Sequence, residues 1–217
     1  MIPLMMVGIF GLLSIAQAQN KEKERIEKAA TVLTDFTGMK EEIPASMLEQ
    51  AQGMVIIPKM INAGLGIGGK RGKGVAVVKL ASGEWSDPVF ITLTGGSIGF
   101  QAGVQAVDLV LIFKHSDALT KTKKGDFTIG GDLAAAAGPI GRSASANTDY
   151  KLDAEVYSYS RSKGLFAGVS INGSNIAFDK TAISSYYGPN TDTQKLFGGN
   201  TYHASEINAL KAALTSK

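Results

Sequence analysis

The chain has 217 residues, enough for one domain with a full hydrophobic core, and it contains no cysteine. The missing thiols exclude a disulfide framework, thiol catalysis, a cysteine-ligated zinc site and a lipid-acylated cysteine. The 22 Lys and Arg residues against 19 Asp and Glu residues give a net charge of +3. This mild balance does not indicate nucleic-acid binding, which usually needs a concentrated basic face.

Residues 1–18 have the features of a secretory signal peptide. An apolar run from Leu4 to Ile15 is followed by Ala16-Gln17-Ala18, a small-x-small sequence typical of a cleavage site. The run is short for a membrane span, although Lys and Arg are missing before it, so an uncleaved anchor is the alternative. We expect cleavage after Ala18, export to the periplasm or the extracellular space, and a single domain over residues 19–217.

Residues 21–37 predict an amphipathic helix, because apolar residues recur at helical spacing among charges of both signs. This helix could pack on the domain or lie on a membrane surface, and the sequence leaves both alternatives open. Gly38 ends the helix, and Pro44 introduces a short second helix over residues 45–51.

Beyond Gly53, runs rich in Val and Ile alternate with glycine, which is typical of strands. The first half of this region predicts a basic turn at 70–74, a hairpin turn at 81–84, a short helix at 115–121, and strands at 54–57, 63–69, 75–80, 89–94, 97–103 and 107–113. The second half predicts a turn at 172–173, helices at 180–187, 192–197 and 205–214, and strands at 127–131, 132–138, 140–146, 152–159 and 164–171. The expected fold is α+β: a strongly twisted antiparallel sheet, open or closed into a barrel-like shape, flanked by N-terminal and C-terminal helices.

The segment from 64 to 74 is rich in glycine and contains Lys70, Arg71 and Lys73. Its first glycines match the dinucleotide pattern G-x-G-x-x-G, but that motif needs a helix after the second glycine, and a strand-like run follows here. We therefore reject a dinucleotide site and expect no cofactor. Cations beside glycine can instead converge with backbone amides on one anion, unless each is merely solvated or paired with a carboxylate.

No motif indicates catalysis. Only His115 and His203 could act as a general base, and neither lies in a nucleophile or metalloprotease motif. The acidic residues form no calcium loop and no evident general-acid pair. We expect no enzyme and no metal site; a hydrolase would need a pocket that joins one of the histidines to a serine and a carboxylate.

Six motifs in order resemble the SYLF domain. They are Met54-Val-Ile-Ile-Pro-Lys59, Ala63-Gly-Leu-Gly-Ile-Gly-Gly69 with Arg71-Gly72, Gly83-Glu-Trp-Ser-Asp-Pro88, Gly95-Gly-Ser-Ile-Gly-Phe-Gln-Ala-Gly103, Ala137-Gly-Pro-Ile-Gly-Arg142, and Tyr157-Ser-Tyr-Ser-Arg-Ser-Lys-Gly-Leu-Phe-Ala-Gly168. The match runs from about residue 29 to residue 188 and leaves a C-terminal helical extension over 189–217.

The resemblance implies lipid or membrane binding without known catalysis. In fungi and animals the SYLF domain is joined to SH3 or FYVE modules and binds phosphoinositide membranes, and yeast members bind actin filaments. Bacterial members usually stand alone behind a signal peptide, the arrangement expected here. The family's amphipathic lead-in helix, implicated in membrane contact, corresponds to the region around residues 21–36.

We therefore expect a secreted, non-enzymatic module that binds anionic phospholipid head groups or a membrane surface. The residues assigned to lipid binding are Lys59, Lys70, Arg71, Lys73, Arg142, Arg161 and Lys163. The alternative is a structural or protein-interaction domain of the cell envelope, with an envelope protein as partner and glycines that serve packing alone. The sequence leaves the lipid species, the orientation on the membrane and the oligomeric state open.

Overall fold

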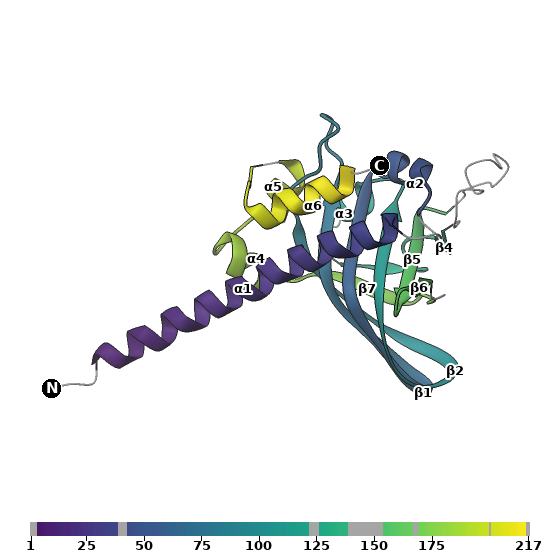
Figure 1. The fold of residues 1–217 in the computed structure, drawn as a ribbon, viewed down its shortest axis with the longest axis horizontal. Helices are drawn as coiled ribbons and strands as arrows, with labels where there is room; N and C mark the ends of the chain where they lie inside the picture. The colour runs from purple at the N-terminus through teal and green to yellow at the C-terminus, as the bar shows by residue number, and fades with distance from the viewer. Residues whose placement is uncertain are drawn as a thin grey trace.

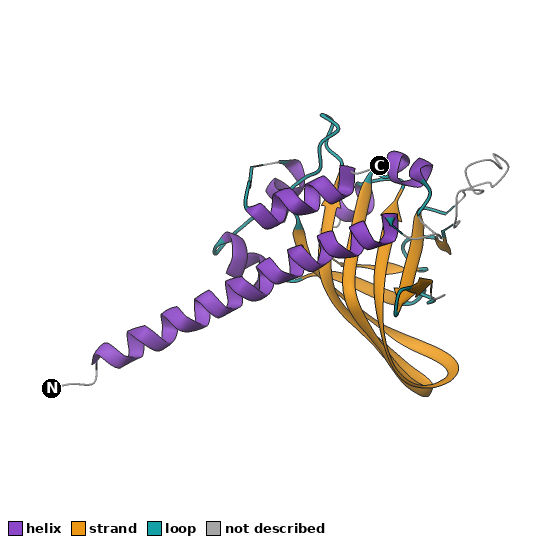
Figure 2. Cartoon of the chain, in the orientation of Figure 1, coloured by secondary structure: helices purple, strands orange, loops and turns teal. Residues whose placement is uncertain are grey.

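The computed structural model describes residues 4–38, 43–121, 126–138, 154–166, 169–199 and 201–215. The helices are α1 (Leu4–Thr37), α2 (Ala45–Gln50), α3 (Asp117–Thr120), α4 (Lys180–Tyr187), α5 (Thr193–Gly198) and α6 (Ser205–Thr215). The strands are β1 (Gly53–Val78), β2 (Val89–Phe113), β3 (Asp126–Ile129), β4 (Ala135–Ala137), β5 (Val156–Ser162), β6 (Leu165–Phe166) and β7 (Ser174–Phe178). The predicted α+β class is confirmed: helices pack against a strongly curled sheet (Figure 1, Figure 2).

β1 and β2 form one long antiparallel ribbon. Pairing runs from Gly53 opposite Phe113 to Ala76 opposite Val89, with two register shifts on the way. The sequence predicted six shorter strands over these residues, with a basic turn at 70–74. That division is wrong, because strand pairing continues through the glycines and through the basic residues.

The ribbon bends back on itself near its middle, at the lower right of Figure 1. A Cβ atom on Gly68 would lie 2.1 Å from the carbonyl oxygen of Ala63, and one on Gly74 would lie 2.1 Å from that of Ile56. The two halves of β1 therefore touch backbone to backbone, at a separation that no side chain fits. Glycine is required at these positions by the close approach of one strand to itself.

β2 carries the other strands on its second edge. β7 pairs with the first half of β2 and β5 with its second half; β3 then pairs with β7, while β4 and β6 pair with β5. Every pair is antiparallel except β4 with β5, which is parallel. The expected antiparallel sheet is therefore correct apart from this short edge strand.

The second half of the chain follows the predicted helices more closely than the predicted strands. α4, α5 and α6 begin and end within a residue or two of the predicted helices. The strand expected over 132–138 shrinks to β4, the one expected over 164–171 shrinks to β6, and β7 was not predicted. The strand expected over 140–146 lies outside the described residues.

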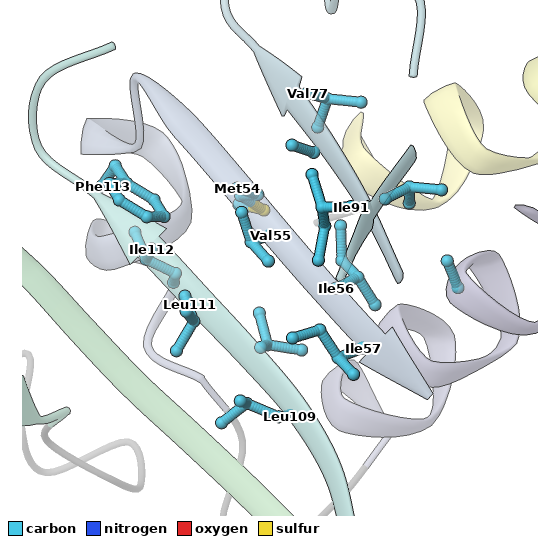
Figure 3. Close-up of a cluster of buried hydrophobic side chains, with 14 of the residues drawn as sticks. Met54, Val55, Ile56, Ile57, Val77, Ile91, Leu109, Leu111, Ile112 and Phe113 are labelled. Atoms are coloured by element: carbon cyan, nitrogen blue, oxygen red, sulfur yellow. The ribbon is translucent and has the colours of Figure 1, made fainter. Parts of the chain in front are cut away.

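The hydrophobic core lies on both faces of the curled sheet, because consecutive residues of β1 and of β2 are buried and neighbouring side chains of a strand point to opposite faces. Figure 3 shows its centre, where Met54 to Ile57 of β1 lie beside Leu109 and Leu111 to Phe113 of β2. α1 packs on this body through β1, α4 and α6. The helix begins at Leu4 rather than near residue 21, and its first half extends away from the body (Figure 1).

The apolar side of α1 faces the protein. Ile26, Ala29, Leu33 and Phe36 are all buried. The packed-helix alternative is therefore the one that the structure shows, and these side chains are not presented to a membrane. No helix in the described part of the chain is long and apolar enough to cross a membrane.

A buried carboxylate fastens the C-terminal segment to the body. Asp87 is fully buried and accepts hydrogen bonds from the amide and hydroxyl of Thr201, both at 2.9 Å, and from the amide of Tyr202 at 3.3 Å. The Nζ of Lys211 on α6 donates a further one at 2.9 Å. The segment 201–215 is thus part of the folded body.

Candidate functional site

The structure describes six of the seven cations predicted to bind lipid, and it separates them into two groups. Arg142 lies outside the described residues. Lys70, Lys73 and Arg161 have partners within the protein, as the following contacts show. Lys59, Arg71 and Lys163 are exposed, and none of them forms a salt bridge among the described residues, although the pKa of Glu24 on α1 is lowered by Lys28 and, to a lesser extent, by Lys59.

Lys70 is enclosed. It lies on β1 opposite Gly95, retains only 5% of its exposed surface, and its Nζ donates to the carbonyl oxygen of Ser170 at 2.5 Å. Burial lowers the pKa of Lys70 below its usual value, because removing the ammonium group from water disfavours its charged form. An ammonium group held in this way is not positioned to meet a membrane surface.

Arg161 joins α1 to the sheet. Its Nε donates to Asp108 at 3.1 Å, and its Nη2 donates to Asp35 on α1. The guanidinium also lies over the ring of Phe36, with 5.5 Å between the guanidinium carbon and the ring centroid. These contacts give Arg161 a structural role at the C-terminal end of α1.

Lys73 belongs to an ion cluster that joins β1, α1 and α4. Its Nζ and the Nη1 of Arg25 each lie 3.2 Å from the Oδ2 of Asp179. The other carboxylate oxygen of Asp179, Oδ1, accepts a hydrogen bond from the Ala182 amide, which makes Asp179 the N-cap of α4. Burial works to raise the pKa of Asp179, but the Ala182 amide, Lys73 and Arg25 outweigh it and the pKa is lowered. Arg25 also pairs with Glu22 at 2.8 Å, and burial raises the pKa of Glu22.

The local backbone explains how two of the exposed cations are presented. Lys59 has a φ of 50° at a register shift in β1, where its amide donates to the Oδ1 of Asp108 at 2.9 Å. Lys163 has a φ of 52° and Gly164 a φ of 77°, between the paired residues Ser162 and Leu165. Positive φ at both central residues is the type I′ hairpin turn, which places the Lys163 side chain at the end of β5 and β6.

These exposed cations lie in or beside the bent end of the ribbon. We call residues 59–71 of β1 and 94–106 of β2 the ribbon tip. The tip contains Lys59, Lys70 and Arg71 and no Asp or Glu. The β5–β6 turn lies beside it, because the Ser162 hydroxyl donates to the carbonyl oxygen of Ala106 at 3.1 Å.

The same end of the molecule exposes large apolar side chains. Five such side chains are exposed among the described residues, and three of them, Ile61, Ile67 and Val104, belong to the ribbon tip. A fourth, Leu165, follows the turn that carries Lys163. Sequence reasoning missed these apolar residues, because Ile and Val in a strand are usually core residues and nothing local marks them as exposed.

Both histidines are exposed, on separate parts of the chain: His115 follows β2 and His203 precedes α6. The hydrolase alternative needs a histidine inside a pocket, and neither side chain is enclosed. Within the described ranges, no three His, Asp or Glu residues are grouped in a way that could hold a metal ion.

Comparison with known proteins gives one family. Residues 94–217 match the Ysc84 family model, described as "Las17-binding protein actin regulator". The LAS seventeen-binding protein 3 of Saccharomyces cerevisiae is 35% identical over 204 residues, which cover 90% of this chain and 44% of the relative. The SH3 domain-containing YSC84-like protein 1 of Homo sapiens is 33% identical over 201 residues, which cover 89% of this chain and 58% of the relative. The chain thus spans about half the length of the curated relatives it matches.

Proposed function

Because the chain belongs to the Ysc84 family, which confirms its resemblance to the SYLF domain, we propose that it is a non-enzymatic module that binds anionic lipid head groups at a membrane surface. The observation that carries this proposal is the group of exposed cations Lys59, Arg71 and Lys163 in and beside an end of the ribbon without carboxylates. A cation near an anionic membrane contributes about 1 kcal/mol to binding when no carboxylate neutralises it. The proposed lipid site therefore excludes Lys70, Lys73 and Arg161, which the sequence had suggested, because each of them has a partner within the protein.

Vesicle flotation with a charge-neutral variant tests the proposal. The variant changes Lys59, Arg71 and Lys163 to Gln, which keeps a side chain at the two positive-φ positions and so leaves their backbone strain unchanged. Three lost cations should weaken binding to vesicles with phosphatidylglycerol roughly a hundredfold, from about 1 kcal/mol for each cation. The wild type should also release such vesicles as salt rises, because salt screens exposed charges.

A matched control changes Lys121, Lys180 and Lys195 to Gln. These lysines are also exposed, on or beside α3, α4 and α5, and Lys121 forms an exposed salt bridge with Asp117 at 2.6 Å. Because three cations are again replaced, the control has the same net charge as the test variant. The control should bind like the wild type. Equal binding of the test and control variants, or equal flotation of the wild type with neutral and anionic vesicles, would contradict the proposal.

We also propose that the protein is exported and that residues 1–18 are removed. The packing of α1 supports this: among its residues from 19 onward, whose burial the structure describes, the buried apolar side chains begin at Ile26, so cleavage after Ala18 would leave these packed residues in place. Intact-mass measurement of the protein from a producing cell tests it. A mass that includes residues 1–18 would contradict cleavage.

Protein binding is the second candidate, and the description of the family favours it. The matched relatives include a LAS seventeen-binding protein, and the family is described as an actin regulator. Co-sedimentation of the purified chain with actin filaments, and pull-down with purified Las17, test this candidate. Binding in either assay without binding to anionic vesicles would favour it over the lipid proposal.

A further inference from the structure

Two large apolar side chains of the ribbon tip are almost fully exposed. Ile67 keeps 82% of its surface in contact with solvent and Val104 keeps 76%. Val104 stands opposite Ala63, and Ile61 lies two residues before Ala63 on the same strand, so Ile61 and Val104 share one face of the ribbon. Single exposed apolar residues are common on protein surfaces, but here three of them belong to the same bent part of the ribbon, which projects from the helix-covered body (Figure 1).

The backbone holds these side chains in an outward position. Strand pairing reaches Gly64 opposite Gly103 and resumes at Gly66 opposite Gly99, so the ribbon is paired on both sides of the bend and its register shifts at the bend itself. On the inner side, Gly68 lies directly against the backbone of Ala63. The two halves of β1 therefore touch here and leave no space between them, so Ile67 cannot turn inward to be buried.

The charge of the tip selects among partners for this apolar surface. A second copy docked through the same surface would bring Lys59 and Arg71 close to their own counterparts, and the tip offers no carboxylate to relieve the repulsion. An anionic bilayer has the opposite charge at its head groups and an apolar layer directly beneath them. Exposed apolar side chains beside exposed cations suit that combination.

We propose that the ribbon tip inserts Ile67 and Val104 into the interface of an anionic bilayer, while Lys59 and Arg71 contact the head groups. This inference rests on the proposed lipid-binding function and adds to it a place and a mode of binding. The long axis of the ribbon then points into the membrane, and the end of the body that carries the 81–84 turn faces away from it.

Single-cysteine labelling tests the insertion, and the cysteine-free chain restricts the label to the chosen site. Ile67→Cys, Val104→Cys and Ser82→Cys are each labelled with the environment-sensitive fluorophore NBD. Ser82 is exposed in the turn after β1, at the opposite end of the ribbon, and serves as the control. With vesicles of phosphatidylcholine and phosphatidylglycerol, emission should rise and shift to the blue at 67 and 104, with quenching by nitroxide lipids, and should stay unchanged at 82.

An unlabelled double variant, Ile67→Asn with Val104→Asn, removes the contribution of the fluorophore itself. Losing the burial of two apolar side chains should weaken vesicle binding by about tenfold or more. Emission from the buried Trp85 should match the wild type, because both changes are at the surface. The salt dependence should also match the wild type, whereas the variant without the three cations should lose it.

The outcomes separate this inference from the proposed function. Flotation of all labelled proteins with water-like emission at 67 and 104 would overturn insertion and leave head-group binding in place. Failure to float with anionic vesicles would overturn both. A change of emission at 67 and 104 that follows protein concentration without vesicles would overturn insertion in favour of a second copy as the occupant.

Discussion

Replacing Gly74 with alanine places a methyl group where the two halves of β1 touch. The new Cβ atom would lie 2.1 Å from the carbonyl oxygen of Ile56 and 2.9 Å from the Cα atom of Ile57. Both neighbours are backbone atoms that no side-chain rotation can move, so the two halves of the strand must separate by roughly 1 Å. Overpacking of this kind costs about 3 kcal/mol, at the upper end of its usual range. For a domain of this size, that cost lowers the Tm by roughly 6–12 °C.

Urea and thermal unfolding, followed by the fluorescence of the buried Trp85, measure this effect. Gly96→Ala is the matched control: Gly96 lies on β2 in the same ribbon, but a Cβ atom there meets nothing within 4 Å. The control should change stability by no more than about 0.5 kcal/mol, with a small gain expected because alanine restricts the unfolded chain. Equal stability of the two variants would refute the reasoning that close approach in β1 requires glycine.

Two further predictions concern buried charges and use urea unfolding. Lys70→Met should be no less stable than the wild type at pH 7, because an apolar chain replaces an enclosed ammonium group without a described carboxylate partner. Because the pKa of Lys70 is lowered in the folded protein, the folded chain loses the Lys70 proton at a lower pH than the unfolded chain, whose lysine pKa is about 10.4. The wild type should therefore gain stability relative to this variant between pH 7 and pH 10, and a stability difference that does not change with pH would contradict burial of the ammonium group. Asp87→Asn should cost about 3 kcal/mol by removing the buried partner of Lys211, and should expose α6 to proteolysis first. Surface Glu84→Gln is its control, and equal protection of α6 in both variants would argue against Asp87 as its anchor.

The sequence predicted the strand content of β1 and β2 but not their continuity. Glycine and proline usually end strands, so Pro58 and the glycines of 64–74 indicated breaks. In the structure, the ladder shifts register beside Pro58 and continues, and the glycines serve the contact between the two halves of β1. That contact joins residues on opposite sides of a bend, and no local pattern reports the bend.

The sequence could not show which of the predicted cations are available to a ligand, because the contacts that decide this also join distant parts of the chain. Arg161 is neutralised by Asp35 and Asp108, which lie 126 and 53 residues away along the chain. Lys70 lies between Gly69 and Arg71, which are both exposed, and only the alternation of strand faces buries it. Residue type and glycine neighbours therefore name candidate cations, whereas the availability of each cation to a ligand depends on tertiary contacts.

The bend in the ribbon also sets the order in which the two halves of the β1–β2 hairpin can form. The sequence separation of paired residues grows from 13 at Ala76 and Val89 to 60 at Gly53 and Phe113. Loop closure favours the shorter separations, so pairing is expected to begin beside the 81–84 turn and to advance through the tip before the first half of β1 meets the second half of β2. The second half of β1 must then pair with the first half of β2 before the remaining halves pair. The glycine-rich bend therefore has to form before the ribbon is complete.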